Sequence, residues 1–273
     1  KSVNVIRMNC AELKIKSCVV KSGGQIIKSS PKTNEKKEEL EIKLGEKIRG
    51  SCTIHLEFEG ILNDRLLGFY RSKYQQNGKT KYLATTQFEA ADARRAFPCW
   101  DEPEAKATYD ISIIAENKFT AISNMPVKTK KKTGNKTTYH FQRTPLVSTY
   151  LIYLGVGEFE YLTGRAGKIQ IRVVTTKGNT SKGKFSLELG KKLLTSYEKY
   201  FGIKFPLPKL DLIAVPDFAA GAMENWGAIT FRETILLYDP KTSSTRTKQF
   251  IAEVISHEIA HMWFGNLVTM KWW

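Results

Sequence analysis

Long apolar runs and paired cysteines are both missing from this sequence of 273 residues. No stretch approaches the roughly 20 consecutive apolar residues that a membrane helix needs, and no signal peptide is visible. The four cysteines, Cys10, Cys18, Cys52 and Cys99, include no Cys-x-x-Cys pair. We therefore expect free thiols in a reducing compartment, the cytoplasm, and no membrane span. Because the sequence begins with Lys1 and not with Met, a preceding segment with its own signal stays an open alternative.

Acidic residues are in the minority, with 27 Asp and Glu against 43 Lys and Arg, so the formal net charge is +16. Such an excess of positive charge can indicate nucleic-acid binding. The basic residues are spread along the chain, however, and the densest run, at residues 128–132, precedes Gly134 between two strand-like segments. No RNP, KH or zinc-finger pattern accompanies this run. We interpret it as a solvated hairpin turn and expect no nucleic-acid partner, with a basic nucleic-acid binder as an alternative.

Alternation of apolar and polar residues dominates the first part of the chain, up to about Thr176. It is clear in residues 52–59 and again in residues 109–113. Many short strands separated by turn signals predict an antiparallel β domain, a saddle or sandwich, over residues 1–176. The polar stretch from Ser29 to Glu39 is predicted as a loop.

A helical period replaces the alternation after Thr176. Apolar residues spaced for one helix face predict an amphipathic helix over residues 185–201, and Gly202 is a typical helix end. Short apolar strands are predicted at residues 210–215 and 228–231. Residues 177–273 are therefore predicted to form the first part of an α+β domain.

Two of only four histidines stand in the pattern His257-Glu258-x-x-His261. The apolar residues around the pattern have a helical period, and residues four apart lie on one helix face. Both imidazoles can therefore bind one metal ion, for which zinc is the usual choice, and the carboxylate of Glu258 can accept a proton beside it. The alternative is that the pattern arises by chance and that both histidines lie at the surface with their hydrogen bonds satisfied.

A catalytic zinc ion needs a third protein ligand, and the sequence after His261 does not contain one. The metzincin pattern is excluded, because Phe264 occupies its Gly position and Leu267 its His position. No Asp, Glu or His follows His261. The third ligand must lie upstream, come from another chain, or follow Trp273.

A loop of small residues, Gly221-Ala222-Met223-Glu224-Asn225, precedes the second of the short apolar strands. Its backbone could meet a peptide as an added strand, and Glu224 could bind a cation. Without further context, we favour an ordinary turn with one solvated Glu.

Together, the GAMEN loop and the HExxH pattern resemble the M1 family of zinc aminopeptidases, the gluzincins. Residues 86–103, TQFEAADARRAFPCWDEP, are similar to a segment of that family. Residues 207–212, 217–220 and 263–273 are similar as well. The resemblance covers nearly all of the chain after about Gly50, and it is strongest to puromycin-sensitive aminopeptidases and their archaeal relatives.

The resemblance implies an N-terminal β domain followed by a thermolysin-like catalytic domain, with residues 177–273 as the first part of the latter. It implies that His257 and His261 bind Zn²⁺ and that Glu258 is the general base. Glu224 and Glu89 would bind the free α-ammonium group of a peptide substrate. The implied substrate-binding residues are Glu89, Gly221, Ala222, Met223, Glu224 and Asn225.

The family pattern HExxH-x18-E places the third ligand, a Glu, at position 280, beyond Trp273. We therefore expect a fragment of a zinc metallo-aminopeptidase that removes N-terminal residues from peptides, inactive as this chain alone. In such a fragment Trp263, Phe264 and Trp272, with Trp273, are expected to face water. The alternatives are a catalytically dead peptide-binding fragment and a gluzincin endopeptidase.

Overall fold

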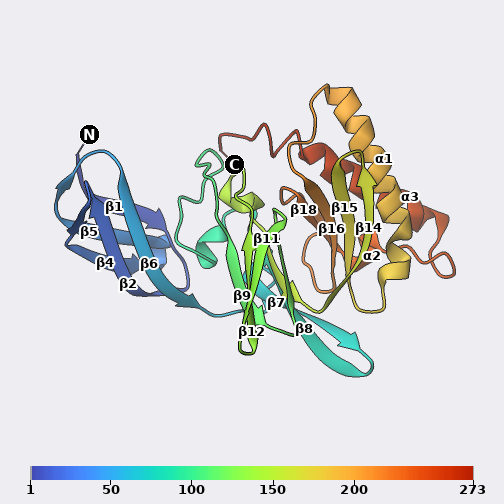
Figure 1. The fold of residues 1–273 in the computed structure, drawn as a ribbon, viewed down its shortest axis with the longest axis horizontal. Helices are drawn as coiled ribbons and strands as arrows, with labels where there is room; N and C mark the ends of the chain where they lie inside the picture. The colour runs from blue at the N-terminus through green and yellow to red at the C-terminus, as the bar shows by residue number, and fades with distance from the viewer. Residues whose placement is uncertain (1, 273) are drawn as a thin grey trace.

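The computed structural model describes residues 2–272, in which eighteen strands form five sheets and three α-helices lie in the C-terminal part of the chain (Figure 1). The N-terminal strands lie at one end of an elongated molecule, and the helices lie at the other end. The predicted order, an antiparallel β region followed by an α+β region, is confirmed. The predicted exposure of Trp273 concerns a residue outside the described range.

Two small antiparallel sheets form the N-terminal end. The first sheet has the order β1 (Val3–Asn9), β5 (Glu39–Ile48), β4 (Ser29–Asn34). The second has the order β3 (Gln25–Ile27), β2 (Leu13–Ser22), β6 (Cys52–Gly60). Alternate residues of both sheets share one core, which includes Val20, Leu40 and Ile42. Burial of one face explains the alternating pattern in the sequence.

The predicted loop from Ser29 to Glu39 is wrong, because most of it is strand β4 followed by the 3-10 turn η1 (Glu35–Lys37). β4 pairs along its length with β5, for example Thr33 with Leu40. It is an edge strand with mostly exposed side chains, so its sequence carries no apolar alternation. Pro31 is tolerated there because an edge strand leaves some backbone N–H groups unpaired.

The middle of the molecule contains two further antiparallel sheets. One has the order β10 (Thr120–Ser123), β13 (Leu154–Gly157), β8 (Lys79–Gln87), β7 (Gly68–Gln76). The other has the order β11 (Val127–Thr133), β12 (Lys136–Phe141), β9 (Ser112–Glu116). Two 3-10 turns accompany them, η2 (Ala93–Arg95) and η3 (Thr149–Leu151).

The lysine run at residues 128–132 is not a turn, which corrects the interpretation from the sequence. These lysines are exposed residues of strand β11, and only residues 134 and 135 separate β11 from β12. β11 is an edge strand, and a charged edge discourages pairing with another chain.

A five-stranded mixed sheet holds the elements of the predicted site. Its order is β14 (Phe159–Ala166), β15 (Ile169–Thr176), β16 (Lys209–Val215), β18 (Ala228–Arg232), β17 (Ala222–Met223). β15, β16 and β18 run parallel, and an antiparallel strand closes each edge. The sheet is continuous across Thr176, since β15 pairs with β16. The domain boundary at Thr176 stays a prediction.

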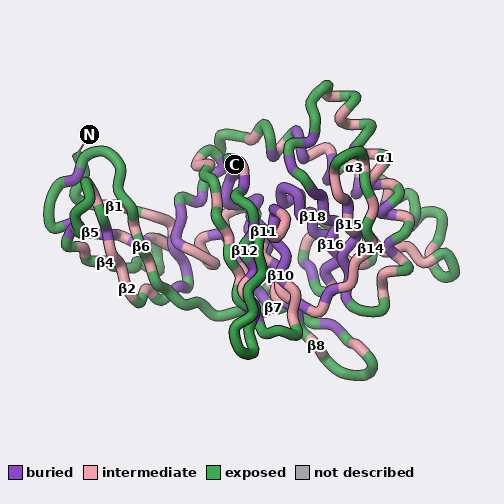
Figure 2. Tube along the Cα trace, viewed as in Figure 1, coloured by how far each residue is buried: buried purple, intermediate pink, exposed green. Residues whose placement is uncertain are grey.

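Three helices pack against this sheet and against one another: α1 (Lys184–Phe201), α2 (Glu233–Leu236) and α3 (Thr245–His261), with η4 (Thr180–Gly183) before them. Gly190 lets α1 approach closely, because a Cβ there would lie 3.2 Å from Leu212 of β16. α1 ends at Gly202, which has a positive φ of 67°, as the sequence indicates. Figure 2 shows buried residues concentrated along β15, β16 and β18, and every residue of β16 is buried. None of the helices within residues 2–272 combines the length and the apolar character that crossing a membrane requires.

Trp263 does not face water, contrary to expectation, and is only 2% exposed. Its indole N–H donates to the carbonyl oxygen of Ile203 at 3.0 Å, and its ring stacks on Phe201. Residues of α1 therefore bury the indole ring of Trp263, which we had expected to face water in this chain. Phe264 and Trp272 are exposed, as expected.

Candidate active site

The C-terminal end of α3 brings the two predicted metal ligands together. The Nε2 atoms of His257 and His261 are 3.0 Å apart, and the two rings are nearly perpendicular, at 81°. Two nitrogens that bind one tetrahedral zinc ion at about 2.0–2.1 Å are separated by about 3.3 Å. The observed spacing fits a shared zinc ion. The partial negative charge at a helix C-terminus also favours a cation at this position.

The ring of His261 is held in one orientation by the loop that follows α3. Its Nδ1 atom lies 2.8 Å from the carbonyl oxygen of Phe264. A carbonyl oxygen only accepts hydrogen bonds, so Nδ1–H donates and the lone pair of Nε2 stays available for a metal. Gly265 is needed for this contact, because a Cβ there would lie 2.9 Å from Nδ1 and its φ is +129°.

Glu258 directly follows His257 in the sequence, and its carboxyl group is buried. It is 5% exposed, and its Oε2 atom is buried without a hydrogen-bond partner among the described residues. Burial first, and then the carboxylates of Glu224 and Glu89, raise the pKa of Glu258 to about 8. A buried, unpaired acid with a pKa near neutral pH is a common feature of catalytic sites.

Three carboxyl groups from separate elements influence one another electrostatically at this site. Glu224 directly follows β17 and is 8% exposed, whereas Glu89 lies just after β8 and is exposed. Although Glu89 is exposed as a residue, partial burial of its carboxyl group first, and then Glu224, raise its pKa, while His261 lowers it. Oε1 of Glu224 lies 3.9 Å from Nδ1 of His261. Such an arrangement can bind a cationic group, because each carboxylate raises the free energy of the others when no cation is present.

Apart from Glu224, the loop at residues 221–225 offers its backbone and not its side chains. β17 is the last strand of its sheet, pairing with β18 on one side, and the N–H of Arg232 donates to the carbonyl of Gly221. The side chain of Met223 is fully buried. Asn225 is also buried, and its Nδ2 donates to Thr230. An extended peptide can pair with the backbone of Ala222 at this edge.

Asn266 is a residue whose role the sequence did not indicate. It is fully buried, its backbone N–H donates to the carbonyl of His261, and its Nδ2 donates to the carbonyl of Glu224 at 2.8 Å. It therefore connects the end of α3 to the loop that carries Glu224. Tyr150, which is also buried, donates its hydroxyl to the carbonyl of Gly265. No periodicity or motif marks such contacts, since they depend on segments distant in sequence.

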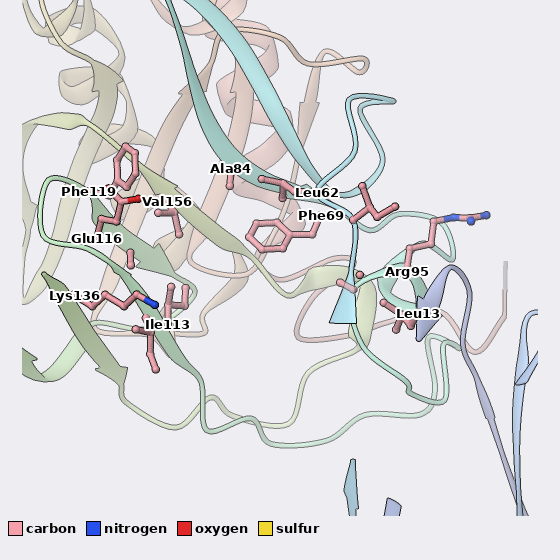
Figure 3. Close-up of a pocket in the computed structure, with 15 residues that line it drawn as sticks. Leu13, Leu62, Phe69, Ala84, Arg95, Ile113, Glu116, Phe119, Lys136 and Val156 are labelled. Atoms are coloured by element: carbon pink, nitrogen blue, oxygen red, sulfur yellow. The ribbon is translucent and has the colours of Figure 1, made fainter. Parts of the chain in front are cut away.

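Within residues 2–272, the histidine pair is not part of a larger cluster of metal-binding side chains, because no group of three His, Cys, Asp or Glu residues there could hold a metal ion. A hollow of about 490 Å³ lies elsewhere, among the β sheets (Figure 3). Apolar side chains such as Phe69, Ile113 and Val156 line it, and it contains none of the predicted site residues. The site is therefore defined by the convergence of charged and imidazole groups and not by this hollow.

Family profiles match most of the chain. The profile described as Peptidase M1 N-terminal domain matches residues 1–151, and the one described as Peptidase family M1 domain matches residues 185–273. The chain belongs to peptidase family M1. The family accounts for the order of the two regions, a β region and then the start of a peptidase domain.

Similar M1 proteins come from a plant, an animal and an archaeon. Aminopeptidase M1 of Arabidopsis thaliana is 49% identical over 241 residues, which cover 88% of this chain and 27% of that protein. Puromycin-sensitive aminopeptidase of Caenorhabditis elegans is 50% identical over 224 residues, covering 81% of this chain and 24% of that protein. Probable aminopeptidase 2 of Sulfurisphaera tokodaii is 50% identical over 221 residues, covering 81% and 28%. The chain spans roughly a quarter of the length of these curated relatives.

Proposed function

We propose that this chain carries part of the active site of a zinc aminopeptidase, which removes N-terminal residues from peptides. The observation that carries the proposal is the convergence of two imidazole Nε2 atoms, 3.0 Å apart, with the buried carboxyl of Glu258 and a pair of further carboxyl groups. The names of the M1 relatives, which are aminopeptidases, support the proposed class of reaction.

His257 and His261 are the proposed zinc ligands, held by α3 and by the contact of His261 with Phe264. A third protein ligand is expected in a catalytic zinc site, and we propose that it comes from outside residues 2–272. Zinc bound there supplies Lewis-acid activation of water and of the scissile carbonyl group.

Glu258 is the proposed general base. Its Oε2 atom has no partner among the described residues, so it is free to accept a proton from water. The resulting carboxylic acid then donates that proton to the leaving amine. The same group then serves both halves of peptide hydrolysis.

Glu224 and Glu89 are the proposed binding groups for the substrate's α-ammonium group. Their mutual repulsion is relieved when one positive charge lies between them. The backbone of Gly221 and Ala222 would bind the first residues of the peptide as an added strand. An acylated N-terminus carries no positive charge, so blocked peptides are poor substrates.

Paired substrates test the proposal on the full-length protein. We expect hydrolysis of alanine 4-nitroanilide and little hydrolysis of its N-acetylated form, together with loss of activity when a chelator removes zinc. Equal rates on the free and blocked substrates would favour an endopeptidase and remove the ammonium-binding role.

Peptide binding without hydrolysis is a second candidate for this chain by itself. It is favoured by the lack of a third metal-binding residue next to the histidine pair within residues 2–272. Zinc stoichiometry and turnover of the purified 273-residue chain separate the two candidates. We also propose a reducing compartment, the cytoplasm, since the four cysteines are free thiols.

A further inference from the structure

A second cavity, of about 360 Å³, lies between the middle of the molecule and the five-stranded sheet. Thr120 of β10 and Lys130 of β11 line one side, and Tyr161 of β14 and Arg172 of β15 line the other. None of the proposed catalytic or substrate-binding residues lines this cavity. Its volume is at the small end of the range for ligand-binding pockets, about 300–1,000 Å³.

The lining of this cavity is positively charged. Lys130, Arg172 and Lys209 contribute to it, and no acidic residue of the described chain lines it. Asp211 lies directly behind the wall, where it accepts from Nε and Nη2 of Arg172, each at 2.6 Å, and from Nζ of Lys209 at 2.7 Å. One buried carboxylate therefore compensates two cations.

Lys130 adds a further positive charge. Its ammonium group lies 5.1 Å from the centre of the Tyr139 ring. None of the carboxylates within residues 2–272 pairs with it. The cavity consequently has two positive charges in excess over Asp211.

Hydrogen-bond donors remain available at two of the three cations. Lys209 donates to Ser123, Gly227 and Asp211, so it contributes charge and no further hydrogen bond. The Nη1 group of Arg172 and the ammonium group of Lys130 donate to no other part of the described chain. Each of the two cations instead makes a cation–π contact with an aromatic ring. Lys130 lies over Tyr139, and the guanidinium carbon of Arg172 lies 5.0 Å from the centre of the Tyr161 ring.

Burial lowers the pKa of Lys209 to about 8, Asp211 acts in the opposite direction, and Arg172 adds to the lowering. An anion in the cavity would raise the pKa of Lys209 again, because it favours the charged ammonium group.

We propose that this cavity binds a small oxyanion of the phosphate class. Arg172 and Lys130 donate charge-assisted hydrogen bonds to the anion, and the positive charge of Lys209 attracts it without a hydrogen bond. The oxyanion is either inorganic phosphate or the phosphate group of a small monoester, for which the cavity has room. Because Lys130 and Arg172 belong to different sheets, the bound anion links the β region to the five-stranded sheet and stabilises the folded protein.

Thermal unfolding of the intact protein tests the proposal, with inorganic phosphate compared with chloride at matched ionic strength and pH. The variants are Lys130→Gln and, as a control, Lys131→Gln, which removes the same charge from the opposite face of β11. We expect phosphate to raise the unfolding temperature above the chloride value. Loss of a charge-assisted bond should weaken phosphate binding about tenfold or more in Lys130→Gln, and Lys131→Gln should bind as the parent protein does.

Titration with O-phosphoserine distinguishes the two sources. Tighter binding than inorganic phosphate supports a monoester as the ligand, and weaker binding supports the free ion, while either result requires the oxyanion site. An equal effect of phosphate on the parent and on Lys130→Gln would overturn the proposal, and so would phosphate acting no differently from chloride. The test does not involve peptide hydrolysis, so its result is independent of the proposed zinc site.

Discussion

Replacing Glu224 by Gln removes one negative charge from the proposed ammonium site and preserves the shape of the side chain. Glu224 is 8% exposed, so water screens its attraction to a substrate ammonium group only weakly. Removing one partner of a buried charge pair typically costs about 2–5 kcal/mol. We therefore expect kcat/KM for alanine 4-nitroanilide to fall roughly 30- to 4,000-fold in the full-length protein.

The corresponding change at Glu89 should have a smaller effect. Glu89 is the more exposed of the two residues, although burial of its carboxyl group still raises its pKa, so Glu89→Gln should reduce kcat/KM less than Glu224→Gln does. Glu188→Gln is the control, since Glu188 is exposed on α1 and, among the described residues, pairs only with Lys191. Zinc content should be unchanged in all three variants.

Two outcomes would refute this reasoning. A loss at Glu89 as large as the loss at Glu224 would mean that burial does not decide the strength of ammonium binding. A loss of zinc from Glu224→Gln would mean that the carboxylate, 3.9 Å from His261, acts by supporting the metal ligand. N-acetylated substrate serves as a second check, because its low rate should be insensitive to either Gln substitution.

Three further substitutions test the site and its support. Glu258→Gln should retain zinc and lower kcat about 10²–10⁴-fold, and loss of zinc along with activity would contradict its role as a base. Gly265→Ala places a Cβ 2.9 Å from His261 Nδ1, so we expect weaker zinc binding in a metal-competition assay, with unchanged affinity as the contrary result. Asp211→Asn should lower the free energy of unfolding by about 3–5 kcal/mol in denaturant titration, since it leaves two cations, one of them the fully buried Lys209, without their carboxylate.

The stability that Asp211 contributes should also depend on pH. Burial opposes its ionisation, but Lys209 and Arg172 together hold the pKa of Asp211 below its usual value. The unfolded chain therefore binds a proton at higher pH than the folded protein does. The contribution is present at neutral pH and is lost as the pH falls through the folded pKa. Unfolding measurements of the parent and Asp211→Asn should converge in acid, and a constant difference would contradict this assignment.

Regular elements with one buried face were predictable from the sequence. Helix α1 carries its apolar residues at helical spacing and ends at Gly202, because burial of one face imposes that spacing. β4 was missed because an edge strand with mostly exposed side chains needs no apolar residues. Trp263 was placed wrongly because the residues that cover it, such as Phe201, lie about sixty positions earlier in the chain.

The sequence by itself determined the pairing of His257 with His261, because a helix places residues four apart on one face whatever surrounds it. It also determined Glu258 as their neighbour. Only the tertiary structure decided the burial of Glu258 and its approach to Glu224 and Glu89, which come from separate strands and loops. Local geometry follows from the backbone, whereas the pKa of a carboxyl group depends on every charge that packing brings near it.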